Sequence, residues 1–249
     1  MSTIIGTAGW SIAAESASAF PAEGSSLERY SAVFRRVEIN SSFHRSHRAS
    51  TWQRWAGSVP EDFRFAVKIP KTISHQAKLV DCDALLDAFL TEADALGDRL
   101  SVLLLQLPPK LAFDVQVAAP FLERLGRLTH ARIACEPRHP SWFEAEPDSL
   151  LEALEVARVA ADPAVVPAAA LPGGWHGLRY WRLHGSPVMY RSAYGPERLA
   201  IYEQAIRAET ESGRDVWCMF DNTASSAATG DALTLRALLA ALDPPPPRS

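Results

Sequence analysis

Runs of β-prone apolar residues alternate along the chain with stretches in which apolar residues recur at helical spacing. The clearest strand pattern is the continuous apolar run 102–107, which ends at Pro108 and is typical of a strand covered on both faces. The clearest helix pattern spans residues 83–96, and Gly97 is well placed to end it. Its apolar positions share one predicted face: Leu85, Leu86, Phe89, Leu90, Ala93 and Leu96.

Eight such runs predict strands, at 3–8, 36–40, 63–69, 102–107, 132–136, 158–162, 178–184 and 216–221. Helical patterns follow seven of them, and the first of these helices begins at a capping box formed by Ser25 and Glu28. The others include a Trp-rich helix with Trp52 and Trp55, and the segments 83–96, 118–128, 149–156, 196–211 and 230–242. Segment 163–177 is rich in Pro, Ala and Gly, so the helix after the sixth strand is expected to be short or absent.

The regular alternation predicts an α/β protein with a single (β/α)8 TIM-like barrel. An open doubly wound sheet would be expected to begin with a Gly-rich phosphate-binding turn, and segment 6–9 lacks the spacing of such a turn. No internal repeat or linker divides the chain. We therefore expect one barrel domain over residues 1–243 and a disordered Pro-rich tail over 244–249.

In a barrel, strand side chains point alternately to the interior and to the helix layer. Because the apolar residues of the predicted strands suit the helix layer, the residues between them turn inward: Glu38, Asn40, Ala66, Lys68, Ala134, Glu136, Tyr180, Arg182 and His184. Gln106 and Asp221 end two further strands on the same parity. The polar members should therefore meet at the C-terminal mouth of the barrel, where barrel enzymes carry out their chemistry.

Composition narrows the functional classes. A length of 249 residues with 47% hydrophobic content is enough to bury a large core. The formal charge of -4, without a basic stripe, weakens a nucleic-acid interpretation but leaves room for a local patch. Neither a signal peptide nor a membrane-spanning run is apparent, so we expect a soluble protein with no membrane partner. The three cysteines are widely spaced and predict a reduced, cytoplasmic protein: Cys82, Cys135 and Cys218.

Several motifs together resemble those of the YecE-like family, a group of bacterial proteins that carry a domain of unknown function. They are Gly6-Thr7-Ala8-Gly9-Trp10, Val37-Glu38-Ile39-Asn40-Ser41-Ser42-Phe43, Phe65-Ala66-Val67-Lys68, Gln106-Leu107-Pro108-Pro109, Glu136-Pro137-Arg138-His139-Pro140-Ser141-Trp142, Arg182-Leu183-His184-Gly185 and Phe220-Asp221-Asn222-Thr223. The resemblance implies a TIM-like barrel and supplies no reaction. His44 stands where the family usually has Tyr, Pro137 replaces a usual Phe, and the loop after Trp10 is short, so details of ligand binding are expected to differ.

The chemistry must therefore be inferred from residue types. Glu38 and Glu136 are candidates for an acid and base pair, and His184 or His75 for a proton relay. Lys68 is the fourth catalytic candidate, since with Arg138 and Arg182 it could hold an anionic group or developing charge. The predicted ligand-binding residues are Trp10, Asn40, Gln106, Arg138, His139, Arg182, Asp221 and Asn222.

Other interpretations remain open. The charged residues could form a self-satisfied structural ring, because buried charges must be paired with or without a ligand. Lys68 could form a Schiff base, although a carboxylate within reach would keep it charged. A metal site is disfavoured, since the cations would compete for the carboxylates, and we expect no cofactor. Cys135 and Cys218 lie on the outward parity and are expected in the core.

Two functional classes follow. The first is a hydrolase-like or lyase-like enzyme that acts on a small anionic or polar metabolite, with Glu136 as the leading acid-base residue. The second is a nucleic-acid module in which mouth aromatics stack on bases, with Trp10, Phe43, Trp142 and Tyr190 as candidates. Its phosphate contacts would come from Arg45, Arg48, Lys71, Lys78, Arg138 and Arg191. The net acidity favours the enzyme.

Overall fold

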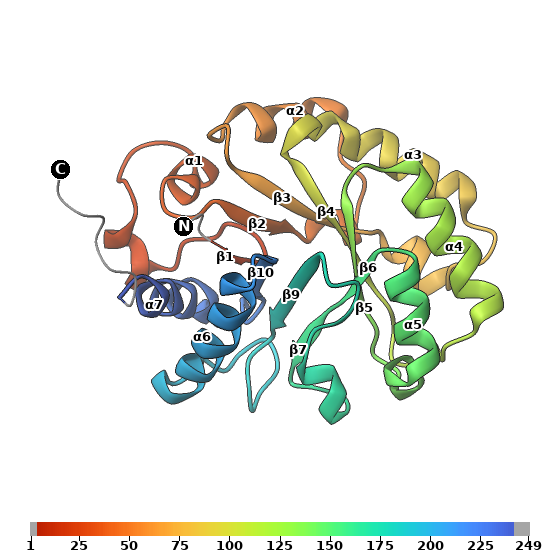
Figure 1. Cartoon of the computed structure of the whole chain (residues 1–249). Coiled ribbons are helices and arrows are strands. Elements are labelled where there is room, and N and C mark those ends of the chain that lie inside the picture. The colour runs from red at the N-terminus through yellow and green to blue at the C-terminus, as the bar shows by residue number, and fades with distance from the viewer. Residues whose placement is uncertain (1–3, 242–249) are drawn as a thin grey trace.

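The computed structural model describes residues 4–241, so Thr3 of the first predicted strand and the predicted tail 244–249 lie outside the described residues. The strands are β1 (Ile5–Thr7), β2 (Arg36–Ile39), β3 (Arg64–Lys68), β4 (Leu100–Gln106), β5 (Arg132–Glu136), β6 (Val156–Arg158), β7 (Ala160–Asp162), β8 (Gly173–Gly174), β9 (Leu178–Leu183) and β10 (Asp215–Phe220). The α-helices are α1 (Ser26–Ser31), α2 (Ala49–Gly57), α3 (Asp83–Ala93), α4 (Val115–Leu128), α5 (Ala145–Ala153), α6 (Pro196–Glu211) and α7 (Ala227–Ala241). The helices lie around the strands (Figure 1).

The strands form two mainly parallel sheets. One has the order β2-β3-β4-β5-β6-β8 and the other β1-β10-β9-β7, and only the short β8 runs antiparallel to its neighbour. An isolated parallel bridge between Ala8 and Glu38 connects the β1 and β2 edges. The predicted sixth strand is divided at Val159 into β6, which pairs with β5, and β7, which pairs with β9. The fold is therefore α/β with parallel sheets that follow one another in chain order.

Several helix boundaries differ from the predicted ones. α5 begins at Ala145 instead of Ser149, because Pro147 fits the first helical turn, where its missing N–H removes no hydrogen bond. The helix predicted over 83–96 ends at Ala93 and continues as the 3₁₀ helix η4 (Asp94–Arg99). Leu85, predicted on its buried face, is 46% exposed, so the buried face is narrower than expected. After β7 only the 3₁₀ helix η6 (Pro167–Ala170) forms, as predicted.

Other local predictions are confirmed. Ser25 and Glu28 form the capping box, since the Ser25 hydroxyl accepts from the Glu28 N–H and the Glu28 carboxylate accepts from the Ser25 N–H at 2.7 Å. α6 occupies the predicted range 196–211. Nine of the ten strands fall within or overlap the predicted runs with small shifts at their ends. The added strand, β8, is only Gly173–Gly174 and lies in the segment predicted to be irregular.

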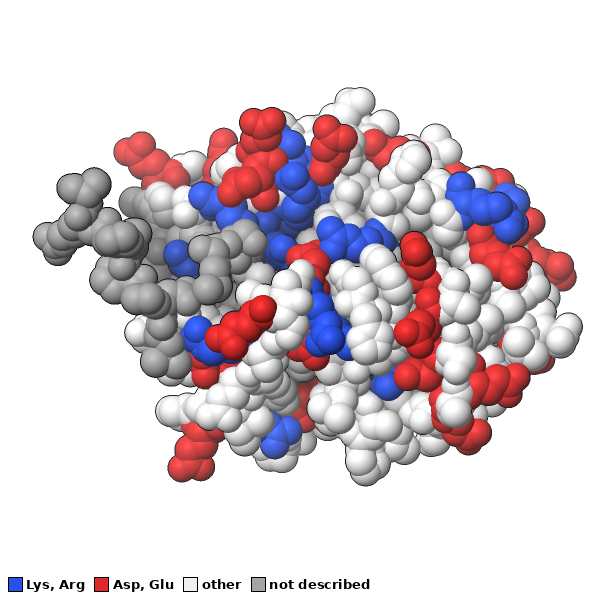
Figure 2. Space-filling view, viewed as in Figure 1, with Lys and Arg blue, Asp and Glu red and all other residues white. Residues whose placement is uncertain are grey.

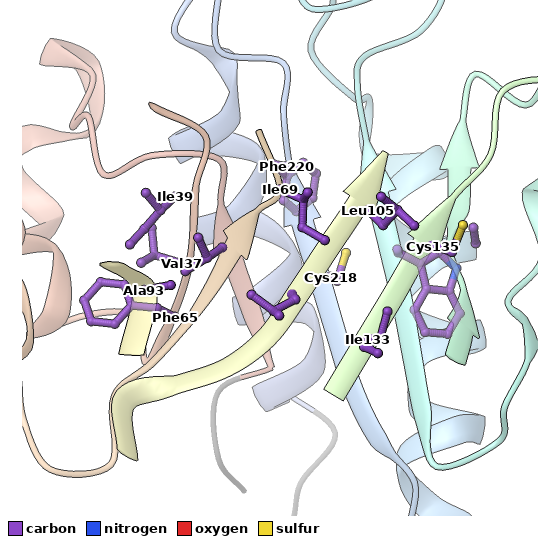
Figure 3. Packing of buried hydrophobic residues seen from close by; sticks show 14 of the residues in the cluster. Val37, Ile39, Phe65, Ile69, Ala93, Leu105, Ile133, Cys135, Cys218 and Phe220 are labelled. Atoms are coloured by element: carbon purple, nitrogen blue, oxygen red, sulfur yellow. The ribbon is translucent and has the colours of Figure 1, made fainter. Parts of the chain in front are cut away.

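Two apolar clusters confirm the predicted alternation of side chains. One lies between strands and helices and includes Val37, Ile39 and Phe65, which lie close to Ala93 of α3 (Figure 3). The other lies on the opposite side of the strands and consists of Ala66, Val102, Leu104, Ala134, Ala157, Val159, Leu178, Tyr180, Trp217 and Met219. The second cluster draws on strands of both sheets, so both sheets turn the same parity toward one shared interior.

A polar cluster lies at the N-terminal ends of the strands. Asp215, at the start of β10, accepts a hydrogen bond from Arg36 at 2.8 Å and one from the indole of Trp217 at 3.2 Å, and it also pairs with Arg132. Arg36 and Arg132 are themselves the first residues of β2 and β5. Basic side chains gather over β2 and β3 near the middle of the face shown in Figure 2.

Among residues 4–241, no helix is sufficiently long and apolar to cross a membrane.

Candidate functional site

Arg182 of β9 is the centre of the candidate site. Its guanidinium is fully buried and binds carboxylates from three other strand ends. Nη2 and Nε donate to Glu38 at 2.6 and 3.0 Å, Nη1 donates to Glu136 at 2.6 Å, and Nη2 also donates to Asp221 at 2.8 Å. The predicted convergence of these four residues is therefore correct. Because Arg182 has no exposed surface, it holds the three carboxylates in place and does not contact a ligand itself.

His184 and Arg138 extend this ring. The His184 ring lies between two carboxylates, with Nδ1 3.0 Å from Asp221 and Nε2 2.8 Å from Glu136. Arg138, in the loop after β5, has Nη2 2.5 Å from a Glu136 oxygen and 2.6 Å from His184 Nε2. An arginine N–H can only donate, so His184 Nε2 either accepts from Arg138 or donates to Glu136. The presence or absence of a hydrogen on Nε2 thus decides whether this atom binds Glu136 or Arg138.

The electrostatics favour the ionised forms of Glu136 and Asp221. Burial by itself would raise the pKa of Glu136, but Arg138, Arg182 and His184 together hold that pKa well below 4.5. The pKa of Asp221 is also lowered, mainly by Arg182 against the opposing effect of burial. Burial opposes the charge on Arg182, yet its carboxylate partners raise its pKa well above the ordinary value. An ionised Glu136 has no proton to donate, and the acid-base role expected of Glu136 stays a prediction.

Polar neighbours complete the ring, which we call the Arg182 ring: Arg182, Glu38, Glu136, Asp221, His184, Arg138, Asn40, Gln106 and Tyr180. The Asn40 amide donates to Asp221 at 3.3 Å, and the Gln106 amide donates to Glu136 at 3.0 Å. The Tyr180 hydroxyl donates to Glu38 at 3.0 Å. Sequence reasoning placed Tyr180 inward but did not include it in the site. Its parity with Arg182 and His184 was the available signal.

Lys68, the last residue of β3, differs from every other charged residue of the site. Its side chain is mostly buried, with the residue 8% exposed, and Nζ lies 4.2 Å from the centre of the Phe43 ring. Within residues 4–241, Nζ forms neither an ion pair nor a hydrogen bond. Burial, followed by the positive charge of Arg182, lowers its pKa to about 8, although Glu38, Glu136 and Asp221 oppose this. No carboxylate of the described chain pairs directly with Nζ, because the arginines occupy those carboxylates.

Local structure fixes the contact between Lys68 and Phe43. Phe43 ends the 3₁₀ helix η2 (Ser41–Phe43), directly after β2. The buried Ser42 hydroxyl hydrogen-bonds the Ile39 carbonyl at 3.1 Å and the Lys68 carbonyl at 2.7 Å, so it connects the ends of β2 and β3. His75 approaches the other ring edge of Phe43, with ring centres 5.0 Å apart. Ser42 was absent from the predicted site, and only its burial and spatial contacts identify its role.

Three predicted ligand-binding residues interact elsewhere. Trp10 packs edge-on against Trp55, with ring centres 5.2 Å apart. His139 accepts from the Ser141 N–H within its own loop. Asn222 donates to Asp231 of α7 at 2.6 Å and to the Ser192 carbonyl. These contacts stabilise loops at the mouth, and none of them reaches the Arg182 ring.

The predicted mouth aromatics also divide by environment. Trp142 is buried and donates its indole N–H to the Leu111 carbonyl at 3.0 Å, so it covers the core edge. Tyr190 is 41% exposed and lies edge-on to His184, with ring centres 5.5 Å apart. Tyr190 therefore shields the imidazole from one side. It is the mouth aromatic, besides Phe43, that a ligand could meet.

The geometry of the ring gives no support to two alternative interpretations, a metal site and a nucleic-acid interface. In the described part of the chain, His, Cys, Asp and Glu side chains form no group of three that could hold a metal ion. The carboxylate oxygens of the ring instead face guanidinium groups. Arg138, a predicted phosphate contact, is bound to Glu136 and His184, whereas Arg45, Arg48 and Arg191 are exposed. One of the six expected phosphate contacts is thus already paired within the site, and the nucleic-acid alternative stays untested.

Known proteins share this fold. A DUF72 family protein from Thermotoga maritima is 22% identical, with a TM-score of 0.78 over 96% of this chain and 100% of that chain. One from Enterococcus faecalis is 19% identical, with a TM-score of 0.80 over 95% of this chain and 94% of that chain. A xylose isomerase domain containing protein from Salmonella typhimurium is 12% identical, with a TM-score of 0.54 over 88% of this chain and 92% of that chain. At these identities the likeness concerns the fold alone.

Comparison of sequences also finds related proteins. The UPF0759 protein YecE of Escherichia coli is 37% identical over 120 residues, 47% of this chain and 43% of YecE. The UPF0759 protein YunF of Bacillus subtilis is 28% identical over 148 residues, 56% of this chain and 51% of YunF. The matched segments therefore span about half the length of these relatives. The model of the family described as "Protein of unknown function DUF72" matches residues 4–249, and the chain belongs to this family.

Proposed function

We propose that this protein is a hydrolase-like or lyase-like enzyme that acts on a small polar or anionic metabolite beside Lys68. The proposal includes closure of the two sheets into a (β/α)8 barrel. The Ala8 to Glu38 bridge, which joins the edge strands β1 and β2, and the continuity of the chain from β6 to β7 through Val159 support this closure. In such a barrel the Arg182 ring would lie at the C-terminal mouth.

The observation that carries the proposal is the contrast between Lys68 and the Arg182 ring. The ring residues bind one another, and Glu136 is held as an ionised carboxylate between two arginines. Lys68 is mostly buried beside them with its amine uncommitted and with a pKa of about 8. A group with a pKa close to neutral pH is well suited to transfer protons. We therefore assign the acid-base role to Lys68, and we assign support of the site to Glu38, Glu136 and His184.

Binding can be tested by NMR on protein that carries ¹³C-labelled lysine. The chain has only four lysines, Lys68, Lys71, Lys78 and Lys110, so each Cε signal can be assigned with a Lys→Arg variant. We expect inorganic phosphate, acetate, malonate or glucose to shift the Lys68 signal saturably, while the Lys110 signal stays in place. If none of these compounds moves the Lys68 signal, the proposed binding site is wrong.

Turnover needs a separate measurement. A panel of small polar and anionic metabolites is incubated with the protein, and consumption is followed by NMR. We expect at least one compound to be consumed by the wild type and by Lys110→Arg but not by Lys68→Arg, which keeps a positive charge and loses the titratable amine. Equal consumption by Lys68→Arg would contradict the role of Lys68. A panel left intact by the wild type would contradict the enzyme assignment for those compounds.

A further inference from the structure

Lys68 has the surroundings of an amine that can react with a substrate and not merely bind it. The residue is 8% exposed, so most of it is shielded from water. The Phe43 ring supports Nζ on one side at 4.2 Å. Within the described residues no carboxylate pairs with Nζ, so no counter-ion fixes the protonated form in place.

We propose that Lys68 forms a Schiff base with an aldehyde or ketone substrate. This inference deepens the proposed function, on which it rests, because it names the carbonyl group as the substrate feature that the site recognises. It changes the role assigned to Lys68 from proton transfer to nucleophilic attack, and it involves no residue beyond those already described. Lysines that act in this way are activated by burial in an apolar pocket or by a neighbouring cation, and Lys68 has both Phe43 and Arg182 nearby.

The chemical step is balanced without a further reactant. The lone pair of neutral Nζ attacks the carbonyl carbon, a C–N bond forms, and the C=O π electrons move to oxygen. Proton transfer from nitrogen to that oxygen gives a carbinolamine. Its hydroxyl group and the remaining N–H proton leave together as water, and a C=N bond remains. The amine and the carbonyl compound thus become an imine plus one water, and uptake of a proton gives the cationic iminium.

The Arg182 ring places three carboxylates near this cationic product, and their charges oppose the effects of burial and Arg182 that disfavour a cation at Nζ. Three ring carboxylates, from Glu38, Glu136 and Asp221, face the guanidinium groups of Arg182 and Arg138. The formal charges of these three carboxylates and two guanidinium groups sum to one negative charge. The iminium would place a positive charge close to them at a point where free Lys68 is partly deprotonated at neutral pH. His75, which also faces this region past Phe43, has its pKa lowered by burial and by Lys68, so it tends to stay neutral.

The experiment uses the full-length folded chain, with glyoxylate and acetaldehyde as probes and sodium cyanoborohydride as the reductant. The reductant delivers hydride to the imine carbon and leaves a stable secondary amine. Peptide mass spectrometry then measures the adduct on each lysine. At pH 7.4 the neutral fraction of an amine of pKa 8 exceeds that of an ordinary lysine by roughly two-hundredfold. We expect Lys68 to be labelled at least about tenfold faster than Lys110, even with restricted access.

Unfolding provides the control, since in urea all four lysines become equivalent and the preference for Lys68 should disappear. Labelling of Lys68 no faster than Lys110 in the folded chain would overturn the inference. If phosphate or malonate shifts the Lys68 NMR signal but neither carbonyl probe is trapped, the Schiff base is wrong and the proposed binding function stands. If Lys68 is trapped preferentially but no polar compound binds or is consumed, the amine is reactive as inferred and the wider proposed function fails. Preference for glyoxylate over acetaldehyde would assign an anionic carbonyl substrate.

Discussion

Arg182 and Glu38 form a two-point ion pair in which both side chains are fully buried. Nη2 to Oε1 is 2.6 Å and Nε to Oε2 is 3.0 Å, so the guanidinium and carboxylate planes meet edge to edge. β2 and β9 belong to different sheets. This pair therefore connects the two sheets through their shared interior, and the remaining donors of Arg182 extend the connection to Glu136 and Asp221.

Arg182→Met should destabilise the protein strongly. The substitution introduces an apolar side chain of similar length and leaves Glu38 and Glu136 buried with fewer cationic partners. We expect the free energy of unfolding to fall by about 3 to 5 kcal/mol, the range for breaking a buried ion pair. Urea unfolding measures it. Arg124→Gln, which removes an exposed pair with Asp87, is the control and should change stability by less than about 1 kcal/mol. Equal losses would mean that the Arg182 ring contributes no more than a surface pair.

Acid should unfold the protein through the ring carboxylates. The pKa of Glu136 is lower in the folded protein than its ordinary value of 4.5, so the unfolded chain binds more protons as the pH falls below that value. The stabilisation from Glu136 is therefore present above about pH 4.5 and is lost as the pH falls toward the folded pKa. Glu136→Gln should be less stable than the wild type at pH 7 by about 3 kcal/mol and should depend less steeply on pH in the acid range. Parallel pH profiles for the two proteins would contradict this assignment.

Lys68→Met should make the protein more stable at neutral pH. The pKa of Lys68 falls from 10.5 to about 8 on folding, so between these values the unfolded chain binds more protons and stability rises with pH. Removing the amine relieves the penalty for holding it charged, which is roughly 3 kcal/mol below pH 8. We expect a higher urea midpoint at pH 7 and a much smaller difference near pH 10.5. Lys110→Met, in an exposed loop, should leave the urea midpoint unchanged both at pH 7 and near pH 10.5. A destabilised Lys68→Met at pH 7 would show that the amine has a stabilising partner.

Asp215→Asn should affect stability without affecting the candidate site. Asp215 holds Arg36 and Arg132 at the N-terminal ends of the strands, the end at which barrel folds keep residues for stability. Because its side chain is 24% exposed, we expect a loss of about 1 to 3 kcal/mol, the scale of hydrogen bonds to a charged group. The NMR response of Lys68 to phosphate should stay as in the wild type. A change in that response would mean that the two ends of the strands are coupled.

Nucleic-acid binding should be absent. One of the expected phosphate contacts, Arg138, is already bound to Glu136 and His184, and the chain as a whole carries a charge of -4. We expect no retention on immobilised single-stranded or duplex DNA at about 50 mM salt, because such binding is strongest at low salt. Retention that weakens as salt increases would restore the nucleic-acid alternative.

The sequence by itself determined which strand residues face the interior. Side chains on a strand alternate with a period of two, so the apolar residues Val37 and Ile39 fix Glu38 on the inner side, as Ile133 and Cys135 do for Glu136. This local rule holds whatever the neighbouring strand is. The predicted convergence of Glu38, Glu136, Arg182 and Asp221 therefore needed no distances. The capping box at Ser25 could also be predicted from a local rule, because its two partners lie three residues apart in the sequence.

Only the tertiary structure decided which of the charged residues bind one another. Arg182 has the reach and the planar donors to bind three carboxylates at once, and this leaves Lys68 outside every ion pair in the described chain. Such a choice depends on distances between strands of different sheets, which a pattern along one strand does not contain. The division of the sixth strand at Val159 has the same origin, because its two halves pair with different neighbours. The sequence predicted a polar site, and the packing between the sheets determined that Lys68 is its free amine.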